Sequence, residues 1–226
     1  MAEVSPAAWQ RPTQGEHRWP AAVSVLVMIA LQVKVLRALD VRPGWIVPGA
    51  ELVLLVVLVR VDPGRMTRET KPLRALGLGL VSAASVANGL AAGSLVYYII
   101  TRDPNLKELS PAGLLFTGGA VWVTNVIAFA LWYWELDSGG PAARANATGG
   151  LPDFLFPQMT QSDVARRDWE PSFVDYLYLA FTNATAFSPT DTLPLTRWAK
   201  LAMMFQSAVS IVIIALVVAR AINILA

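Results

Sequence analysis

The last quarter of the chain constrains its fold most, because a long apolar stretch follows a much shorter one. Residues 199–225 form an apolar run long enough to cross a bilayer, which takes about 20 apolar residues in a helix. The amphipathic run 173–185 is too short to cross, and a polar turn broken by Pro189 and Pro194 separates the two. This order predicts a re-entrant unit. Bare backbone at membrane depth is tolerated only where protein or a water-filled cavity covers it, so the unit suggests a pore or a polar cavity.

Residues 181–196 read Phe-Thr-Asn-Ala-Thr-Ala-Phe-Ser-Pro-Thr-Asp-Thr-Leu-Pro-Leu-Thr. This segment resembles the pore loop of the potassium-channel superfamily, in which threonines lead into Gly-Tyr-Gly-Asp and then a Pro and a Thr. Asp191, Pro194 and Thr196 fall on the family's Asp, Pro and Thr without a gap, and Thr185 falls on its first filter-side Thr. The chain is also similar to a group of bacterial integral membrane proteins that pair four upstream spans with such a degenerate pore loop.

The resemblance implies a homotetrameric ion channel, but the centre of the loop departs from the family. Ser188 and Thr190 replace the two filter glycines, and Pro189 replaces the filter tyrosine. A stack of carbonyls that replaces the hydration shell of potassium needs dihedrals that glycine adopts cheaply and these residues do not. The resemblance therefore implies a path for weakly selected monovalent cations rather than for potassium alone.

The candidate site has two parts. The predicted constriction uses hydroxyl groups and backbone carbonyls of one continuous segment, and the predicted lining of the inner helix uses two polar residues four positions apart that face one lumen or one neighbour. Asp191 either pairs with Arg197 or Lys200 or caps the inner helix. The constriction residues are Thr185, Ala186, Phe187, Ser188, Pro189, Thr190 and Asp191, and the lining residues are Gln206 and Ser210.

A second function class stays open. If Phe187 and Pro189 plug the path, the channel-like fold survives without conduction, and the protein is an integral membrane scaffold or a subunit of a complex. The two classes differ in whether reconstituted protein passes thallium or potassium.

Composition favours a membrane protein and argues against an enzyme. The chain is 55% hydrophobic and only 15% charged, whereas an average soluble protein has about 25% charged residues. Cysteine is absent and His17 is the only histidine, so we expect no catalytic residues, no metal site and no cofactor. The net charge of +2 is too small to indicate a nucleic-acid partner. The expected partner is the lipid bilayer of a cell membrane, which the chain crosses several times.

The apolar pattern predicts an all-α transmembrane fold with five membrane-spanning helices and a re-entrant pore helix and loop between the fourth and fifth. The first four spans lie at about 21–39, 46–61, 75–100 and 113–134. The expected organisation is a disordered N-terminal tail (1–19), a three-helix transmembrane bundle (20–112) and a pore-like module (113–226). That module contains an outer helix (113–134), a long loop (135–171), the pore helix and loop (172–196) and the inner helix (197–226).

Three polar residues within the predicted spans raise the question of partners. Asn88 and Asn125 both fall near mid-membrane, so they are expected to pair across helices. Glu51 lies near the start of the second span. We expect it to be solvated or paired with Lys34, and a role as a proton relay stays open because ionisable groups inside a bilayer are functional candidates.

The long loop 135–171 is expected to be flexible in its first half, whereas Phe154, Leu155 and Phe156 in its second half should dock on the bundle. Two arguments about its side of the membrane conflict. The short basic loop 60–74 should stay in the cytoplasm, which opens the pore loop to the cytoplasm as well. The potassium-channel pattern requires the opposite orientation. Short loops weigh most in the positive-inside rule, so we favour a cytoplasmic mouth.

Overall fold

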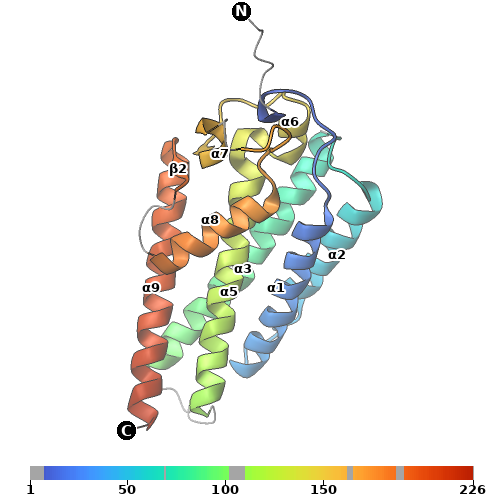
Figure 1. The fold of residues 1–226 in the computed structure, drawn as a ribbon. Coiled ribbons are helices and arrows are strands. Elements are labelled where there is room, and N and C mark those ends of the chain that lie inside the picture. Colours follow the sequence, from blue (N-terminus) through green and yellow to red (C-terminus); the bar gives the residue numbers. More distant parts are fainter. Residues whose placement is uncertain (1–7, 69, 102–109, 162–164, 187–190, 226) are drawn as a thin grey trace, which may run out of the picture.

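The computed structural model describes residues 8–68, 70–101, 110–161, 165–186 and 191–225, and this part of the chain is mostly helical (Figure 1). Long helices form the body of the molecule, and short elements gather at one end. In chain order the elements are η1 (Ala8–Gln10), α1 (Trp19–Ala38), α2 (Ile46–Val61), α3 (Lys71–Thr101), α5 (Pro111–Leu136), η2 (Asp137–Gly139), α6 (Pro141–Ala145), β1 (Phe154–Leu155), α7 (Pro157–Thr160), α8 (Phe173–Ala186), β2 (Leu193–Pro194) and α9 (Arg197–Leu225).

Three segments that are distant in the sequence meet at one end of the bundle, which we call the cap end: residues 11–18, 62–68 and 137–161. The amide of Met66 donates to the carbonyl of Glu16 at 3.1 Å, and the amide of Thr13 donates to the carbonyl of Ala145 at 2.8 Å. The side chain of Asn146 donates to the carbonyl of Thr67 at 2.8 Å. Helices α1, α3 and α9 run away from the cap end, and α2 and α5 run towards it (Figure 1).

Four helices in the described part are long and apolar enough to cross a membrane, namely α1, α3, α5 and α9. These correspond to the first, third, fourth and fifth predicted spans. Helix α2 has 16 residues, or about 24 Å at 1.5 Å per residue, which is shorter than the hydrocarbon core of about 30 Å. It lies beside α1 and α3 and returns the chain to the cap end (Figure 1). Its count as a fifth span stays a prediction.

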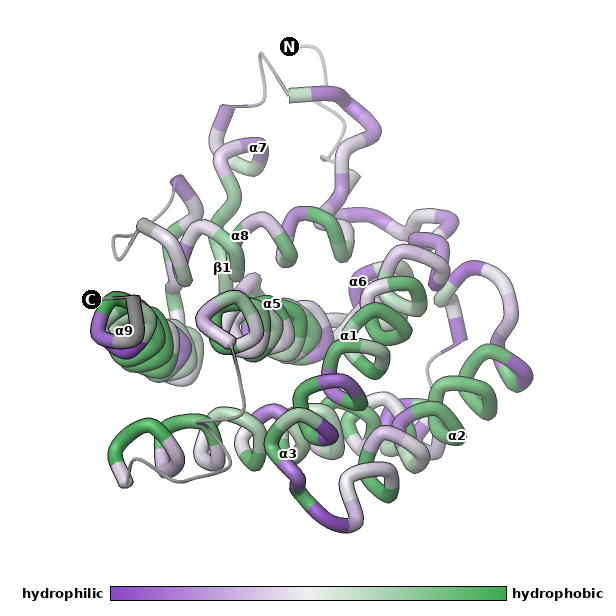
Figure 2. The backbone as a smooth tube through the Cα atoms, turned by 90° about the horizontal axis from the view of Figure 1, so that it is seen from below, coloured by the Kyte–Doolittle hydropathy of each residue, from purple (hydrophilic) through white to green (hydrophobic). Residues whose placement is uncertain are grey.

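Helix α5 is the central element, because it packs against α1, α3, α8 and α9. Figure 2, viewed along the bundle, shows α5 between α9 on one side and α1 on the other. The two modules expected at 20–112 and 113–226 therefore share α5 as a common packing partner. Small residues of α5 permit the close approach: a Cβ added at Gly118 would meet the side chain of Val217 of α9 at 2.6 Å.

The cap end differs from the expected disordered tail and flexible loop. Residues 1–7 lie outside the described part, but residues 11–18 are tied to the bundle by the backbone bonds above and by the side chain of Glu16. The first half of the connection after α5 forms η2 and α6, with Asp137, Ala143 and Ala145 buried. This segment is ordered because its backbone and charged groups have buried partners. A composition rich in Gly and Pro does not reveal those partners. The predicted docking of Phe154 and Phe156 is confirmed, since both are buried.

A layer of buried polar side chains links three spans at mid-bundle. Asn88 of α3 donates to Asn125 of α5 at 3.2 Å, which confirms their predicted pairing. Thr124 donates to the side-chain oxygen of Asn88 at 2.8 Å. Asn125 in turn donates to the hydroxyl of Ser210 of α9 at 3.1 Å. The amides thus use both donor and acceptor atoms between helices, where unsatisfied polar groups are costly.

We expect Asn125→Ala to lower the free energy of unfolding by about 1–2 kcal/mol, because it leaves polar atoms of Asn88 and Ser210 without a partner in the bundle. Thermal or denaturant unfolding in detergent measures this change. A double-mutant cycle with Asn88→Ala should give a coupling energy of favourable sign, and strict additivity of the two single losses would contradict the interaction.

The positions of the connections between helices also predict which end of the bundle faces the cytoplasm. Gly150 belongs to the cap end and Thr70 directly precedes α3, which starts there, whereas the connection between α1 and α2, which contains Arg42, lies at the opposite end (Figure 1). The chain has no cysteine, so single Cys variants report cleanly. Because basic residues gather in the short 60–74 loop, we expect Thr70→Cys and Gly150→Cys to be shielded from an impermeant thiol reagent in intact cells and Arg42→Cys to be labelled. Labelling of Thr70→Cys and Gly150→Cys alone would place the cap end outside.

Candidate functional site

The candidate site is the segment formed by α8, residues 187–196 and the start of α9, of which residues 187–190 lie outside the described part. The ring of Phe173, at the first turn of α8, packs edge-on against Trp134 with 5.7 Å between centroids. The ring of Phe181, towards the other end, packs in the same way against Trp122 at 5.7 Å. The two tryptophans are 12 residues apart in α5, whereas the two phenylalanines are eight residues, or about 12 Å, apart in α8, which crosses α5 obliquely (Figure 1).

The next residues that the structure describes after α8, 191–195, lie at the cap end. Strand β2 pairs antiparallel with β1, with Leu193 opposite Leu155 and Pro194 opposite Phe154. The amide of Leu195 donates to the carbonyl of Asp153 at 2.7 Å, and the indole of Trp198 donates to its carboxylate at 2.8 Å. The described residues on both flanks of α8 therefore lie at the cap end of the bundle.

A buried amide cluster holds the inner end of α8. Asn183 donates to the carbonyl of Met203 at 3.0 Å and to the side-chain oxygen of Gln206 at 2.8 Å. The hydroxyl of Tyr133 in α5 donates to the same oxygen of Gln206 at 2.7 Å. The amide nitrogen of Gln206 donates to the carbonyl of Ala180 at 2.8 Å. This cluster joins α5, α8 and α9 and sets how far α8 enters the bundle.

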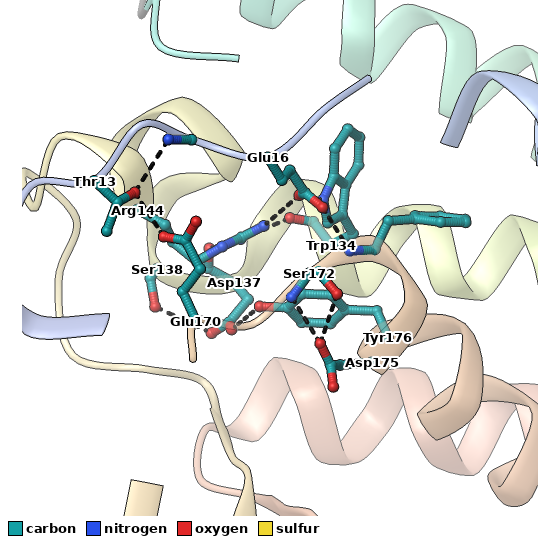
Figure 3. A network of polar contacts seen from close by, with 12 residues as sticks. Thr13, Glu16, Trp134, Asp137, Ser138, Arg144, Glu170, Ser172, Asp175 and Tyr176 are labelled. Carbon is teal, nitrogen blue, oxygen red and sulfur yellow. Dashed lines mark hydrogen bonds and ion pairs between the residues drawn. The ribbon is translucent and has the colours of Figure 1, made fainter. Parts of the chain in front are cut away.

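A second cluster holds the outer end of α8 (Figure 3). The hydroxyl of Tyr176, which is fully buried, donates to the carboxylate of Asp137. Asp175 accepts from the amide of Ser172 at 2.8 Å and from its hydroxyl at 2.7 Å, which organises the first turn. The amide of Phe173 donates to Glu16 at 2.7 Å. An acidic side chain at a helix start also interacts favourably with the helix dipole.

Arg144 of α6 lies at the centre of this outer cluster (Figure 3). It donates to the carbonyls of Trp134 and Asp137, each at 2.8 Å, and its guanidinium lies 5.0 Å from the centroid of the Tyr176 ring. Its other nitrogen lies 3.8 Å from the carboxylate of Glu16. Burial raises the pKa of Glu16 above its ordinary value, although Arg144 and the hydrogen bonds from Trp134 and Phe173 lower it.

The structure separates the predicted site residues. Thr185 is exposed, and its hydroxyl donates to the carbonyl of Phe181 at 3.0 Å. Ala186 ends α8, and Asp191 is exposed beside β2. In the described part no salt bridge joins Asp191 to Arg197 or Lys200, so the expected ion pair is absent there. The remaining constriction residues, Phe187, Ser188, Pro189 and Thr190, lie outside the described part.

The predicted lining residues of α9 point into the helical bundle. Gln206 and Ser210 are both fully buried, and both are bonded to α5 or α8 by the contacts given above. Sequence reasoning missed Asn183 and Tyr133 as the partners of Gln206. A signal was present, because Tyr176, Ala180 and Asn183 follow the spacing of one helix face, and a polar residue on an otherwise buried face needs a partner.

The outer cluster was also missed, because its members come from residue 16, residues 134–144 and residues 172–176. No local pattern joins these segments. Among the residues that the structure describes, no group of three or more His, Cys, Asp or Glu side chains is placed to hold a metal ion. Comparisons with protein-family models, with curated proteins and with solved structures find no match to this chain.

The raised pKa of Glu16 predicts a pH dependence of stability. A carboxyl whose pKa is higher in the folded than in the unfolded state stabilises the fold below the unfolded value of about 4.5, and this contribution is lost as the pH rises through the folded value. Relative to Glu16→Gln, the wild-type protein should therefore lose stability as the pH rises above about 4.5. Unfolding temperatures of both proteins in one detergent test this, and parallel pH profiles would contradict it.

Proposed function

We propose that this protein is a pore-loop ion channel for weakly selected monovalent cations, assembled from four copies around the segment 173–196. The observation that carries the proposal is the path of α8. It ends beside Met203 and Gln206, whereas the residues on both of its flanks lie at the cap end. A short helix whose preceding and following residues both lie at the same end of the bundle has the arrangement expected of a re-entrant pore helix.

The physical argument for assembly concerns the exposed side of this segment. Val174, Tyr178, Phe181 and Thr185 form the outward face of α8 and are exposed in the single chain. Irregular backbone at membrane depth is tolerated only where protein or water covers it. One re-entrant segment cannot enclose a path by itself, so further copies of the chain supply the cover in this proposal.

Helix α9 offers a broad apolar surface to such copies or to lipid. Figure 2 shows it at the edge of the bundle, with hydrophobic residues over most of its length. Because Gln206 and Ser210 are turned inward and bonded, the proposed ion path depends on residues 185–191 for polar contacts. The exposed apolar side chains include Leu201, Met204, Phe205, Ile211, Val212, Ile214, Val218 and Ile222.

The inward position of Gln206 and Ser210 is also the observation that favours a second function. An inner helix that exposes mainly apolar side chains suits a non-conducting membrane scaffold or complex subunit as well as a channel. In that case the two clusters around α8 serve only to hold the fold, and the outward faces of α8 and α9 bind neighbouring membrane proteins.

Reconstitution separates the two functions. A channel should carry thallium or potassium into liposomes well above protein-free vesicles, and native mass spectrometry should show four copies. Thr185→Val should change the ratio of potassium to sodium flux, because its hydroxyl is proposed to face the path. Thr101→Val is the matched control, since Thr101 is an exposed threonine that also donates to the carbonyl four residues earlier, at the end of α3.

The double variant Ser188→Gly/Thr190→Gly should shift selectivity further, because glycine adopts the dihedrals of a carbonyl-lined filter. A stable oligomer without flux would contradict the channel and favour the scaffold. An equal effect of Thr185→Val and Thr101→Val would show that the path does not run through the segment after α8.

A further inference from the structure

A groove lies between α1 and α8, with α5 as its floor, and the functions above do not use it. Helices α1 and α8 both pack on α5, on adjoining sides of it (Figure 2). The groove has a volume of about 540 Å³, within the range of roughly 300–1,000 Å³ that is usual for small-molecule sites. Val126 and Ile127 on its floor are buried. Its walls carry exposed apolar side chains, among them Val23, Val27, Val174 and Phe181.

The lining of this groove suits hydrocarbon. None of the described residues that line it is charged. Among the lining side chains only those of Ser24, Tyr178 and Trp122 carry a polar atom, and the indole nitrogen of Trp122 is buried. A bound water needs two to four polar partners, so most of this surface offers water nothing to bond. The absence of charge also argues against an ion or a lipid headgroup as the occupant.

The depth of the groove places it among lipid tails. Helix α1 begins at the cap end with Trp19, which is exposed, and an exposed tryptophan at the end of a span suits the membrane interface. Val23 and Val27 follow Trp19 by four and eight residues, or about 6 and 12 Å along the helix. One leaflet contributes about 15 Å to a hydrocarbon core of about 30 Å. The groove therefore falls within the acyl-chain region of the leaflet at the cap end.

The width of the groove decides between a lipid tail and a helix of a second copy. Cα atoms of α1 and α8 come within 8 Å of each other. A helix has a diameter of about 10–12 Å with its side chains, so walls that approach this closely leave no room for one between them. A single hydrocarbon chain is much thinner than a helix and can reach the floor of the groove.

We propose that this groove binds one acyl chain of a phospholipid from the leaflet at the cap end. The chain restores the dispersion contacts that an empty groove would forfeit on its floor and on both walls. It covers the side of α8 that faces α1, whereas in the proposed assembly other copies cover the rest of the exposed face, including Thr185. The site does not rest on ion conduction, because a scaffold with the same fold would bind the same chain.

Photo-crosslinking tests the proposal. The full chain is reconstituted in phosphatidylcholine vesicles that contain a small fraction of phosphatidylcholine with a diazirine midway along one acyl chain. After illumination, mass spectrometry maps the labelled residues. We expect labelling of residues 23–27 and 174–181 to exceed that of the exposed apolar residues of α2 and α9, which meet only exchanging bulk lipid.

Variants that fill the groove give the matched comparison. Val27→Trp should lose the excess labelling of residues 174–181, because the indole occupies the space of the tail, and Val23→Trp should do the same from the next turn. Both valines are exposed, so the larger side chain causes no clash in the core. The control is Val53→Trp, because Val53 is an exposed valine of α2 outside the groove, eight residues from the end of α2 at the cap end.

Thermal unfolding in detergent gives a second readout. A ligand that binds only the folded state stabilises it, so added phosphatidylcholine should raise the unfolding temperature of the wild type and of Val53→Trp more than that of Val27→Trp. An equal rise in all three proteins would overturn the site, as would labelling of the groove that does not exceed labelling of α2 and α9. If Val27→Trp instead dissociates an oligomer and leaves the labelling unchanged, a second copy rather than a lipid tail occupies the groove.

Discussion

The need to satisfy buried polar groups without water governs the position of α8. A helix of 14 residues has too little apolar surface to define a unique depth by itself, and lipid tails provide no hydrophobic preference for one neighbour over another. Its inner end is fixed by the cluster of Asn183, Tyr133 and Gln206. Its outer end is fixed by the bonds from Tyr176 to Asp137 and from Phe173 to Glu16. A shift of α8 along its neighbours would break both clusters and leave their donors or acceptors without partners. The depth of α8 in the bundle and its register against α5 and α9 are therefore fixed together.

The outer cluster also explains why the segments around α5 form an ordered cap rather than loose loops. Arg144 bonds to backbone carbonyls at the end of α5, lies against Tyr176 and faces Glu16. A buried guanidinium is tolerable only with several such partners, because its desolvation is costly. The partners come from the N-terminal segment, α5, η2 and α8, so the buried charge on α6 draws these elements together. The cap in turn holds β1 against β2 and sets the start of α9.

Two kinds of polar side chain are buried inside the bundle. The layer of Asn88, Asn125 and Ser210 pairs each donor with an acceptor, and we interpret it as packing that fixes neighbouring spans. Glu51 is fully buried, and among the described residues no salt bridge joins it to Lys34, so the expectation that it is solvated or paired with Lys34 was wrong.

Part of this structure could be predicted from the sequence alone. Apolar runs longer than a bilayer is thick determined the positions of the long helices, and the short run before the last span determined that α8 is a half-length helix. The pairing of Asn88 with Asn125 was predictable because both fall at similar depth in helices that must hide their amides. The docking of Phe154 and Phe156 followed from their apolar character within a polar connection.

Only the tertiary structure decided which way the polar side chains point and which segments meet. Gln206 and Ser210 have the spacing of a lining face, but their direction depends on partners in α5 and α8 that no local pattern links to them. Glu16, Arg144 and Tyr176 meet for the same reason, since their contact arises from the packing of distant segments. The periodicity and length of an apolar run are properties of one segment, so the sequence reveals them directly. The partner of a buried polar group lies on another helix, and the separation of two residues in the sequence does not indicate whether they meet.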